Sequence, residues 1–290
     1  LRETLTLQQE LFGSDHADIA RTLQNLAKVI QQAGNLDAAI PIMQSAVAMQ
    51  RKLRGTVPHP DLAEEINDLG FMMQERGDYD ASEALMQEAI VMKRKLLGDK
   101  HPEIGTGLNN LAFLRHHKGD LDLAEATYLE ALKMQYELLG DIHPDIGSTL
   151  NNLAFVQDDK GDLPGALATE REALRVYRAL FPGDHPEVAR IMNRLGYWLI
   201  EAGDYNEAER DLQQALGMRR RLLGEEHPDV ASSLTHLAIL QVAKRDYRAA
   251  LDSAIEANRI STKALSAEHW RTAVAASAER AARSGLGQYA

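Results

Sequence analysis

Apolar residues follow the period of an α-helix in two successive stretches in the middle of the chain. Leu108, Leu111 and Leu114 recur three residues apart, which places them on one face of a helix. This series stops at Gly119, where glycine favours the left-handed backbone that ends many helices. A second apolar series follows at once and ends at Gly140. The pattern therefore predicts an antiparallel pair of helices of about 15 and 18 residues, joined by a tight turn.

The same pattern recurs along the chain, and a histidine marks the start of each unit. The histidines are separated by 43 residues once and then by 42 residues each time: His16, His59, His101, His143, His185, His227 and His269. A fixed period of this length predicts a repeat array, in which each helix pair buries its apolar face against its neighbours. Successive histidines are too far apart to share a metal ion. We expect each to fix its junction by a hydrogen bond near a helix N-terminus.

Two other repeat folds have a similar period. Propeller blades need alternating strands and a Trp-Asp signature, whereas this chain is rich in Leu, Ala, Glu, Gln and Arg. Helical repeats of the HEAT type are disfavoured by small residues at fixed places, which let the two helices of a pair approach closely. These residues are Ala112, Ala124 and Ala131, then Ala154, Ala166 and Ala173, then Gly196, Ala208 and Ala215.

Together these motifs resemble the tetratricopeptide repeat, in the longer form found in kinesin light chains. Leu-x-x-Leu-Ala, Gly-Asp followed by Tyr or Leu, and Leu-Gly-Asp-x-His-Pro carry the resemblance over residues 1–270. It implies an all-α, right-handed α-solenoid of antiparallel helix pairs, forming a single domain over residues 1–283. The expected parts are a partial repeat 1–15, full repeats near 16–58, 59–100, 101–142, 143–184, 185–226 and 227–268, a terminal helix 269–283 and a frayed tail 284–290.

Two local departures from the pattern carry further expectations. Leu1 opens in the middle of a repeat, which suggests that the chain is a piece of a longer protein. Arg245 stands where glycine normally ends the first helix of a repeat, so we expect an altered turn there.

Aligning the repeats reveals a row of asparagines and a row of aromatic residues, each with a spacing of 42. The asparagine row comprises Asn67, Asn109, Asn151 and Asn193, and the aromatic row comprises Phe71, Phe113, Phe155 and Tyr197. Within a repeat the two are four residues apart and therefore share a helix face. The resemblance implies that this face lines the concave side of the solenoid. An amide can pair with a peptide bond there, and an aromatic ring adds apolar contact area.

A structural interpretation of both rows stays open. The asparagines could cap or bridge adjacent first helices, and the aromatic residues could pack against the next repeat. Arg190 and Arg194 add positive charge to the proposed groove, but no row of Lys and Asn matches the carboxylate clamp of chaperone-binding tetratricopeptide domains. Basic runs late in the second helices, such as 219–221, are either a rim that attracts acidic partners or cations favoured by the helix dipole.

Composition excludes several classes of function. Net charge is −11, which disfavours non-specific nucleic-acid binding. The chain has no cysteine, which excludes thiol catalysis and disulfides and fits a cytoplasmic location. It has neither an 18-residue apolar run nor a phosphate-binding or nucleophile motif. We therefore expect no enzyme activity, cofactor, metal, nucleic acid or membrane.

The expected function is a non-catalytic scaffold that binds a peptide segment of a partner protein in its groove. Two alternatives stay open. The array could be the sensor of a larger signalling protein, acting on a flanking ATPase or protease domain of the same chain. It could also self-assemble through the open ends of the solenoid.

Overall fold

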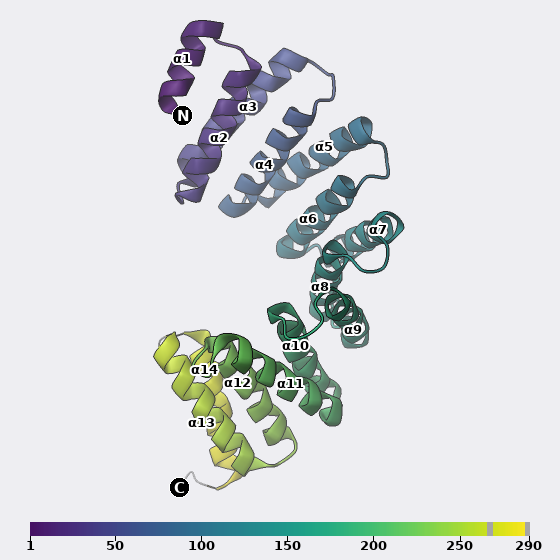
Figure 1. Cartoon of the computed structure of the whole chain (residues 1–290), viewed down its shortest axis with the longest axis vertical. Helices are drawn as coiled ribbons and strands as arrows, with labels where there is room; N and C mark the ends of the chain where they lie inside the picture. The colour runs from purple at the N-terminus through teal and green to yellow at the C-terminus, as the bar shows by residue number, and fades with distance from the viewer. Residues whose placement is uncertain (266–268, 288–290) are drawn as a thin grey trace. The chain divides into compact units, whose positions relative to one another are not determined.

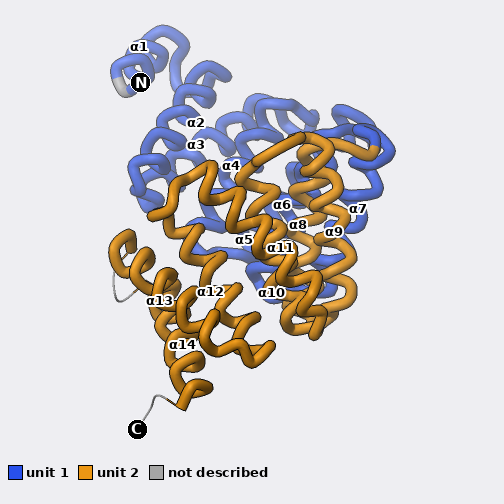
Figure 2. The backbone as a smooth tube through the Cα atoms, turned by 60° about the horizontal axis from the view of Figure 1, so that its bottom comes forward, with its two compact units in different colours: residues 1–140 blue, residues 141–290 orange. Residues whose placement is uncertain are grey.

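The part of the chain that the structure describes consists of helices and connecting turns. The computed structural model describes residues 1–265 and 269–287, and these residues form fourteen helices and no strand (Figure 1). They divide into two compact units, residues 1–140 and residues 141–290 (Figure 2). The end of the predicted repeat 227–268 and the end of the predicted tail 284–290 lie outside the described residues.

Unit 1 contains a leading helix and three helix pairs. Its helices are α1 (Arg2–Phe12), α2 (Ala17–Gln32), α3 (Leu36–Arg54), α4 (Pro60–Arg76), α5 (Tyr79–Leu97), α6 (Pro102–Lys118) and α7 (Leu121–Leu139). The extra residue of the first repeat lies in the loop between α3 and α4, because both neighbouring second helices are 19 residues long. The insertion thus lengthens a loop and leaves the helices unchanged.

Unit 2 contains three further pairs and a last helix. Its helices are α8 (Pro144–Asp159), α9 (Leu163–Leu180), α10 (Pro186–Ala202), α11 (Tyr205–Leu223), α12 (Pro228–Ala243), α13 (Tyr247–Ala264) and α14 (Trp270–Gly285). All six predicted helix pairs are therefore present. The last helix ends two residues beyond the predicted limit of 283. The single domain over residues 1–283 stays a prediction.

Small residues set the close approach of the two helices in a pair, as the sequence predicted. Ala112, Ala124 and Ala131 are fully buried between α6 and α7. At Gly196 an added Cβ would lie 2.4 Å from Cγ of Leu212, so α10 and α11 touch too closely there even for alanine. Larger side chains fill the space towards the next pair, as Met86, Ile90, Ile104 and Leu108 do between α5 and α6.

Each histidine of the series caps the helix that follows it, which confirms the prediction. In all seven, Nδ1 accepts a hydrogen bond from the backbone N–H two residues later, at 3.1–3.3 Å. Five of the seven helices then begin with proline. The exceptions are α2, which begins with alanine, and α14, which begins with tryptophan. The cap satisfies one of the backbone donors that a helix start leaves open.

Replacing one capping histidine therefore has a modest, predictable cost. We expect His101→Ala to lower the free energy of unfolding by about 1 kcal/mol, because the N–H of Glu103 loses its acceptor. His101→Asn should retain most of that stability, since asparagine is itself a strong N-cap. Urea denaturation followed by circular dichroism measures both variants. Equal losses in the two would show that the histidine acts through something other than the cap.

The turn after α12 corrects an expectation. Arg245 adopts φ 63°, a left-handed conformation that glycine provides in the corresponding turns. In this turn the backbone N–H groups of Lys244 and Asp246 donate to the carbonyl oxygens of Leu240 and Gln241. The turn after α8, where Gly161 stands, has the same two hydrogen bonds. The predicted alteration is therefore wrong. Arginine accepts the strained conformation, and the turn keeps its geometry.

Candidate functional site

In unit 2 the asparagine row connects successive first helices. The side-chain oxygen of Asn151 on α8 accepts hydrogen bonds from Arg190, at 3.0 Å, and from Arg194, both on α10. The side-chain nitrogen of Asn193 on α10 lies 3.0 Å from Nδ1 of His236 on α12. Both asparagines are buried. They thus make the bridging contacts that the structural interpretation describes, and they position neighbouring side chains.

In unit 1 the asparagine row has different surroundings. Asn67 on α4 and Asn109 on α6 are half-buried, and the side-chain oxygen of Asn109 has no hydrogen-bond partner. Other residues connect α2 with α4 here. Gln24 donates to Asp68 at 2.8 Å, and Gln31 donates to Glu75 at 2.9 Å. The row therefore has no single structural role along the chain.

The aromatic row also divides into partly buried and exposed members. Phe71 packs against the apolar cluster between α5 and α6, as the structural interpretation expects. Phe113 and Phe155 are 38% and 37% exposed. Tyr197 is half-buried, with its ring centroid 5.1 Å from that of His236. Exposed rings on first helices are available for ligand contact, whereas Phe71 belongs to the core.

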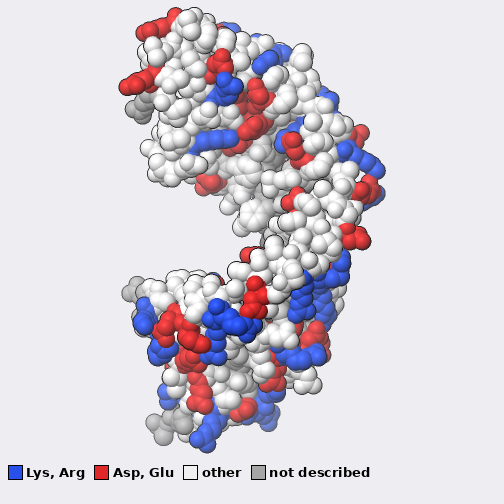
Figure 3. Space-filling view, in the orientation of Figure 1, with Lys and Arg blue, Asp and Glu red and all other residues white. Residues whose placement is uncertain are grey.

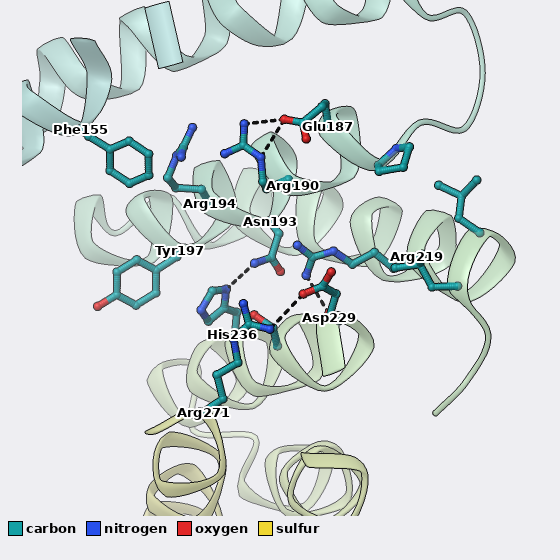
Figure 4. A pocket seen from close by; sticks show the side chains of 14 residues that line it. Phe155, Glu187, Arg190, Asn193, Arg194, Tyr197, Arg219, Asp229, His236 and Arg271 are labelled. Carbon is teal, nitrogen blue, oxygen red and sulfur yellow. Dashed lines mark hydrogen bonds and ion pairs between the residues drawn. The ribbon is translucent and has the colours of Figure 1, made fainter. Parts of the chain in front are cut away.

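A pocket in unit 2 is lined by four arginines, two carboxylates, a histidine and two aromatic rings. It has a volume of about 460 Å³ and is bordered by α8, α10, α11, α12 and α14 (Figure 4). We call it the arginine pocket. It is lined by Phe155, Pro186, Glu187, Arg190, Asn193, Arg194, Tyr197, Arg219, Leu222, Leu223, Asp229, Ser232, His236 and Arg271.

Arg194 is held on one wall of the arginine pocket by a buried carboxylate. It forms an ion pair with Glu170 of α9, which is fully buried, and its guanidinium lies 4.0 Å from the ring centroid of Phe155. Burial raises the pKa of Glu170, and the charge of Arg194 offsets this in part. Nε of Arg194 is buried without a hydrogen-bond partner. The side chain is therefore fixed in place but has an unused donor.

Two further arginines pair with carboxylates at the mouth of the pocket. Arg190 donates to Glu187, one turn earlier on α10, at 2.6 Å and 2.8 Å. Arg271 of α14 donates to Asp229 of α12 at 3.1 Å. All four side chains are partly exposed, so these pairs contribute little to stability and can rearrange.

Arg219 on α11 has no carboxylate partner among the described residues. Its Nη1 donates to the backbone oxygen of Asp229 at 2.7 Å and to Oγ of Ser233 at 2.8 Å. The residue is only 6% exposed, and burial lowers its pKa to about 10. It therefore remains charged at neutral pH. Three carboxylates balance the other three arginines, so the pocket has one excess positive charge.

His236 lies between Asn193 and Tyr197 at the base of the pocket (Figure 4). Burial, followed by the charge of Arg219, lowers its pKa to about 4. The imidazole is therefore neutral at physiological pH and serves as a hydrogen-bonding group. Among the described residues, no cluster of three His, Asp or Glu side chains could hold a metal ion.

The structure brings five of the ten sequence-predicted site residues together in the arginine pocket: Phe155, Arg190, Asn193, Arg194 and Tyr197. Asn151 lies behind them and orients two of the arginines. The other four, Asn67, Phe71, Asn109 and Phe113, belong to unit 1 and do not line this pocket. Sequence reasoning missed Asp229, His236 and Arg271, and it placed Arg219 only in a basic run.

The remaining basic residues of the second helices mostly pair with the next repeat. Arg51 bonds to Glu88 at 2.7 Å, and Arg94 bonds to Glu130 at 2.6 Å. In unit 2, Arg171 and Arg220 bond in the same way to carboxylates of the following second helix. Figure 3 shows basic and acidic side chains intermixed over much of the face in view, together with one larger continuous basic area. Many of these basic residues are therefore compensated by a carboxylate, whereas Arg178 and Arg219 bond only to neutral groups.

No helix among the described residues has the length and apolar character that a membrane-spanning segment needs. Comparison with protein families gives repeated matches to one family model, the tetratricopeptide repeat. The matched residues are 1–52, 62–136, 103–179 and 182–263. None of the curated proteins compared with the chain matches it significantly.

Solved structures show the same fold. BtubC (BKLC) from P. vanneervenii is 26% identical with a TM-score of 0.68, and the alignment covers 79% of this chain and 91% of that chain. A putative kinesin light chain from Podosopora anserina, with nearly identical TPR-like repeats, is 20% identical with a TM-score of 0.63 over 72% of this chain and 99% of its own. The second similarity concerns the fold alone.

Proposed function

The chain belongs to the tetratricopeptide repeat family, and on that premise we propose that it is a non-catalytic scaffold that binds a peptide segment of a partner protein. Members of this family typically mediate protein–protein interactions. The proposed ligand contacts are the side chains of the asparagine and aromatic rows on the first helices of each unit. In unit 2 these rows border the arginine pocket.

One observation carries this proposal. Phe113 and Phe155 keep more than a third of their surface exposed, at the same position of successive first helices. An exposed aromatic ring gains free energy when a partner buries its apolar surface, by roughly 25 cal/mol per Å². Aromatic residues are also frequent among the side chains that dominate protein interfaces.

Selection from a proteome-derived peptide library tests the proposal. We expect the native protein to enrich a set of related peptides and Phe113→Ala/Phe155→Ala to bind them at least about tenfold more weakly, because two contact rings are lost. The matched control is Val91→Ala/Leu129→Ala, which removes two apolar side chains of second helices that are more exposed than the two phenylalanines. It should bind as the native protein does. No enrichment by folded native protein, or equal losses in both variants, would contradict the proposal.

A further inference from the structure

Arg219 occupies a position that other repeats fill without an unpaired charge. The equivalent residues on the other second helices are Gln50, Lys93, Gln135, Tyr177 and Ser261. Four of these are neutral and buried. Lys93 is charged, but it is partly exposed and bonds to Glu103 at 2.9 Å. Packing between repeats therefore does not require an arginine at this position.

An arginine here is also unfavourable for stability. Transferring a charged group from water into a protein interior costs several kcal/mol unless an opposite charge compensates it. Arg219 donates only to neutral oxygens, from Asp229 and Ser233. The nearby carboxylate of Asp229 favours its charge, but this carboxylate is already paired with Arg271. At the equivalent contact in unit 1, Gln50 meets Glu65, and neither residue is a cation. Packing does not need a cation at this position. The buried charge of Arg219 therefore points to a ligand that carries the opposite charge.

The surroundings of Arg219 are suited to an anionic group with an apolar neighbour. Arg190 and Arg271 approach the same space from α10 and α14 (Figure 4). Arg194 adds an unused Nε donor, and the rings of Phe155 and Tyr197 border one side. The volume of about 460 Å³ lies within the range of small-ligand pockets, roughly 300–1,000 Å³.

We propose that the arginine pocket binds an oxyanion, a carboxylate or a phosphoryl group, carried by the peptide ligand, with Arg219 as its central donor. A guanidinium pairs with both groups through two parallel N–H bonds, and a buried pair of this kind is stronger than one in water. Arg190 and Arg271 can turn from their exposed carboxylate partners towards the ligand. This inference rests on the proposed function, because the oxyanion is taken to belong to the bound peptide.

Capped tripeptides provide defined probes. Acetyl-Ala-Glu-Ala-amide, acetyl-Ala-phosphoserine-Ala-amide and acetyl-Ala-Gln-Ala-amide differ in the central side chain, so the first two separate the two sources of an oxyanion. Trp198 lies beside Arg194, with its ring 5.3 Å from the guanidinium carbon, and its indole N–H signal in NMR spectra should report binding. Inorganic phosphate at constant ionic strength is the fourth probe.

Arg219→Gln is the decisive variant, because Gln50 and Gln135 show that this fold accepts a buried glutamine at the same position. The matched control is Arg221→Gln on the same helix, which removes an equal charge from an exposed pair with Asp184. We expect at least one anionic peptide to saturate the Trp198 signal. Arg219→Gln should weaken that binding at least about tenfold, and Arg221→Gln less than about twofold.

Three results would overturn the inference: binding of the glutamine peptide as tight as that of the anionic peptides, native affinity in Arg219→Gln, or no saturation by either anionic peptide. Arg271→Gln, on a different helix, provides a second test if Arg219→Gln changes the fold.

The library selection separates the two proposals. Enriched peptides that bind Arg219→Gln normally would reject only the oxyanion site, whereas anionic tripeptides that bind without any library enrichment would reject only the proposed scaffold function.

Discussion

Glu170→Met should lower the free energy of unfolding of unit 2 by about 3–5 kcal/mol, the usual cost of removing one partner from a buried ion pair. Glu170 is fully buried on α9, and Arg194 is its ion-pair partner. Methionine fits the space, since the equivalent positions on other second helices hold Met43 and Met86. The loss therefore comes from the uncompensated charge of Arg194. Both tryptophans, Trp198 and Trp270, lie in unit 2, so tryptophan fluorescence during urea denaturation reports on it.

A double variant identifies the cause of this loss. Arg194 stands where Asn110 and Asn152 occur in other repeats, so Glu170→Met/Arg194→Asn replaces the ion pair with residues that the array already uses. We expect it to recover most of the lost stability, because removing both charges leaves no uncompensated buried ion. Glu207→Gln, which removes the partner of Arg171 from an exposed pair, should change stability by less than about 1 kcal/mol. A double variant as unstable as the single one would show that packing causes the loss.

Above pH 7, Glu65→Gln should raise the free energy of unfolding of unit 1 by up to about 3 kcal/mol relative to the native protein. The figure follows from the shift in the pKa of Glu65, since one pKa unit corresponds to roughly 1.4 kcal/mol. Glu65 is fully buried on α4, and burial raises its pKa from 4.5 to about 7. One oxygen accepts from Gln50 at 3.3 Å, and the other has no partner. The folded state therefore binds the proton more tightly than the unfolded state. Stability from this group is present below pH 4.5 and is lost as the pH rises to 7.

Denaturation in urea at pH 5 and pH 8, followed by circular dichroism, measures this effect. The difference between Glu65→Gln and the native protein should be larger at pH 8, because the variant cannot ionise. Glu64→Gln, at the exposed neighbouring position, should show a difference of less than about 1 kcal/mol at either pH. A difference for Glu65→Gln that does not change with pH would mean that the carboxyl group stays in one protonation state throughout.

Glu170 and Glu65 illustrate what repeat alignment reveals about a site. Both are carboxylates at positions where other repeats have neutral residues, such as Leu212 for Glu170 and Thr149 for Glu65. The sequence therefore contains a signal for Glu170 and Glu65, namely a charge at a position that is otherwise neutral. The signal for Arg194 and Arg219 is weaker, because Asp68 and Lys93 stand at their equivalent positions. Predicting their partners from the sequence was not possible, because each partner lies on a different helix and no motif sets its spacing.

The sequence by itself determined the helices, their pairing, the histidine caps and the family. These depend on interactions within about one turn or between adjacent helices, and the 42-residue period repeats them. Only the tertiary structure decided that Asn151 and Asn193 bridge first helices, that Phe71 packs against the apolar cluster between α5 and α6, and where the arginine pocket forms. The reason is physical: the pocket depends on how side chains from five helices approach one space and on which charges remain unpaired there, and no single repeat contains that information.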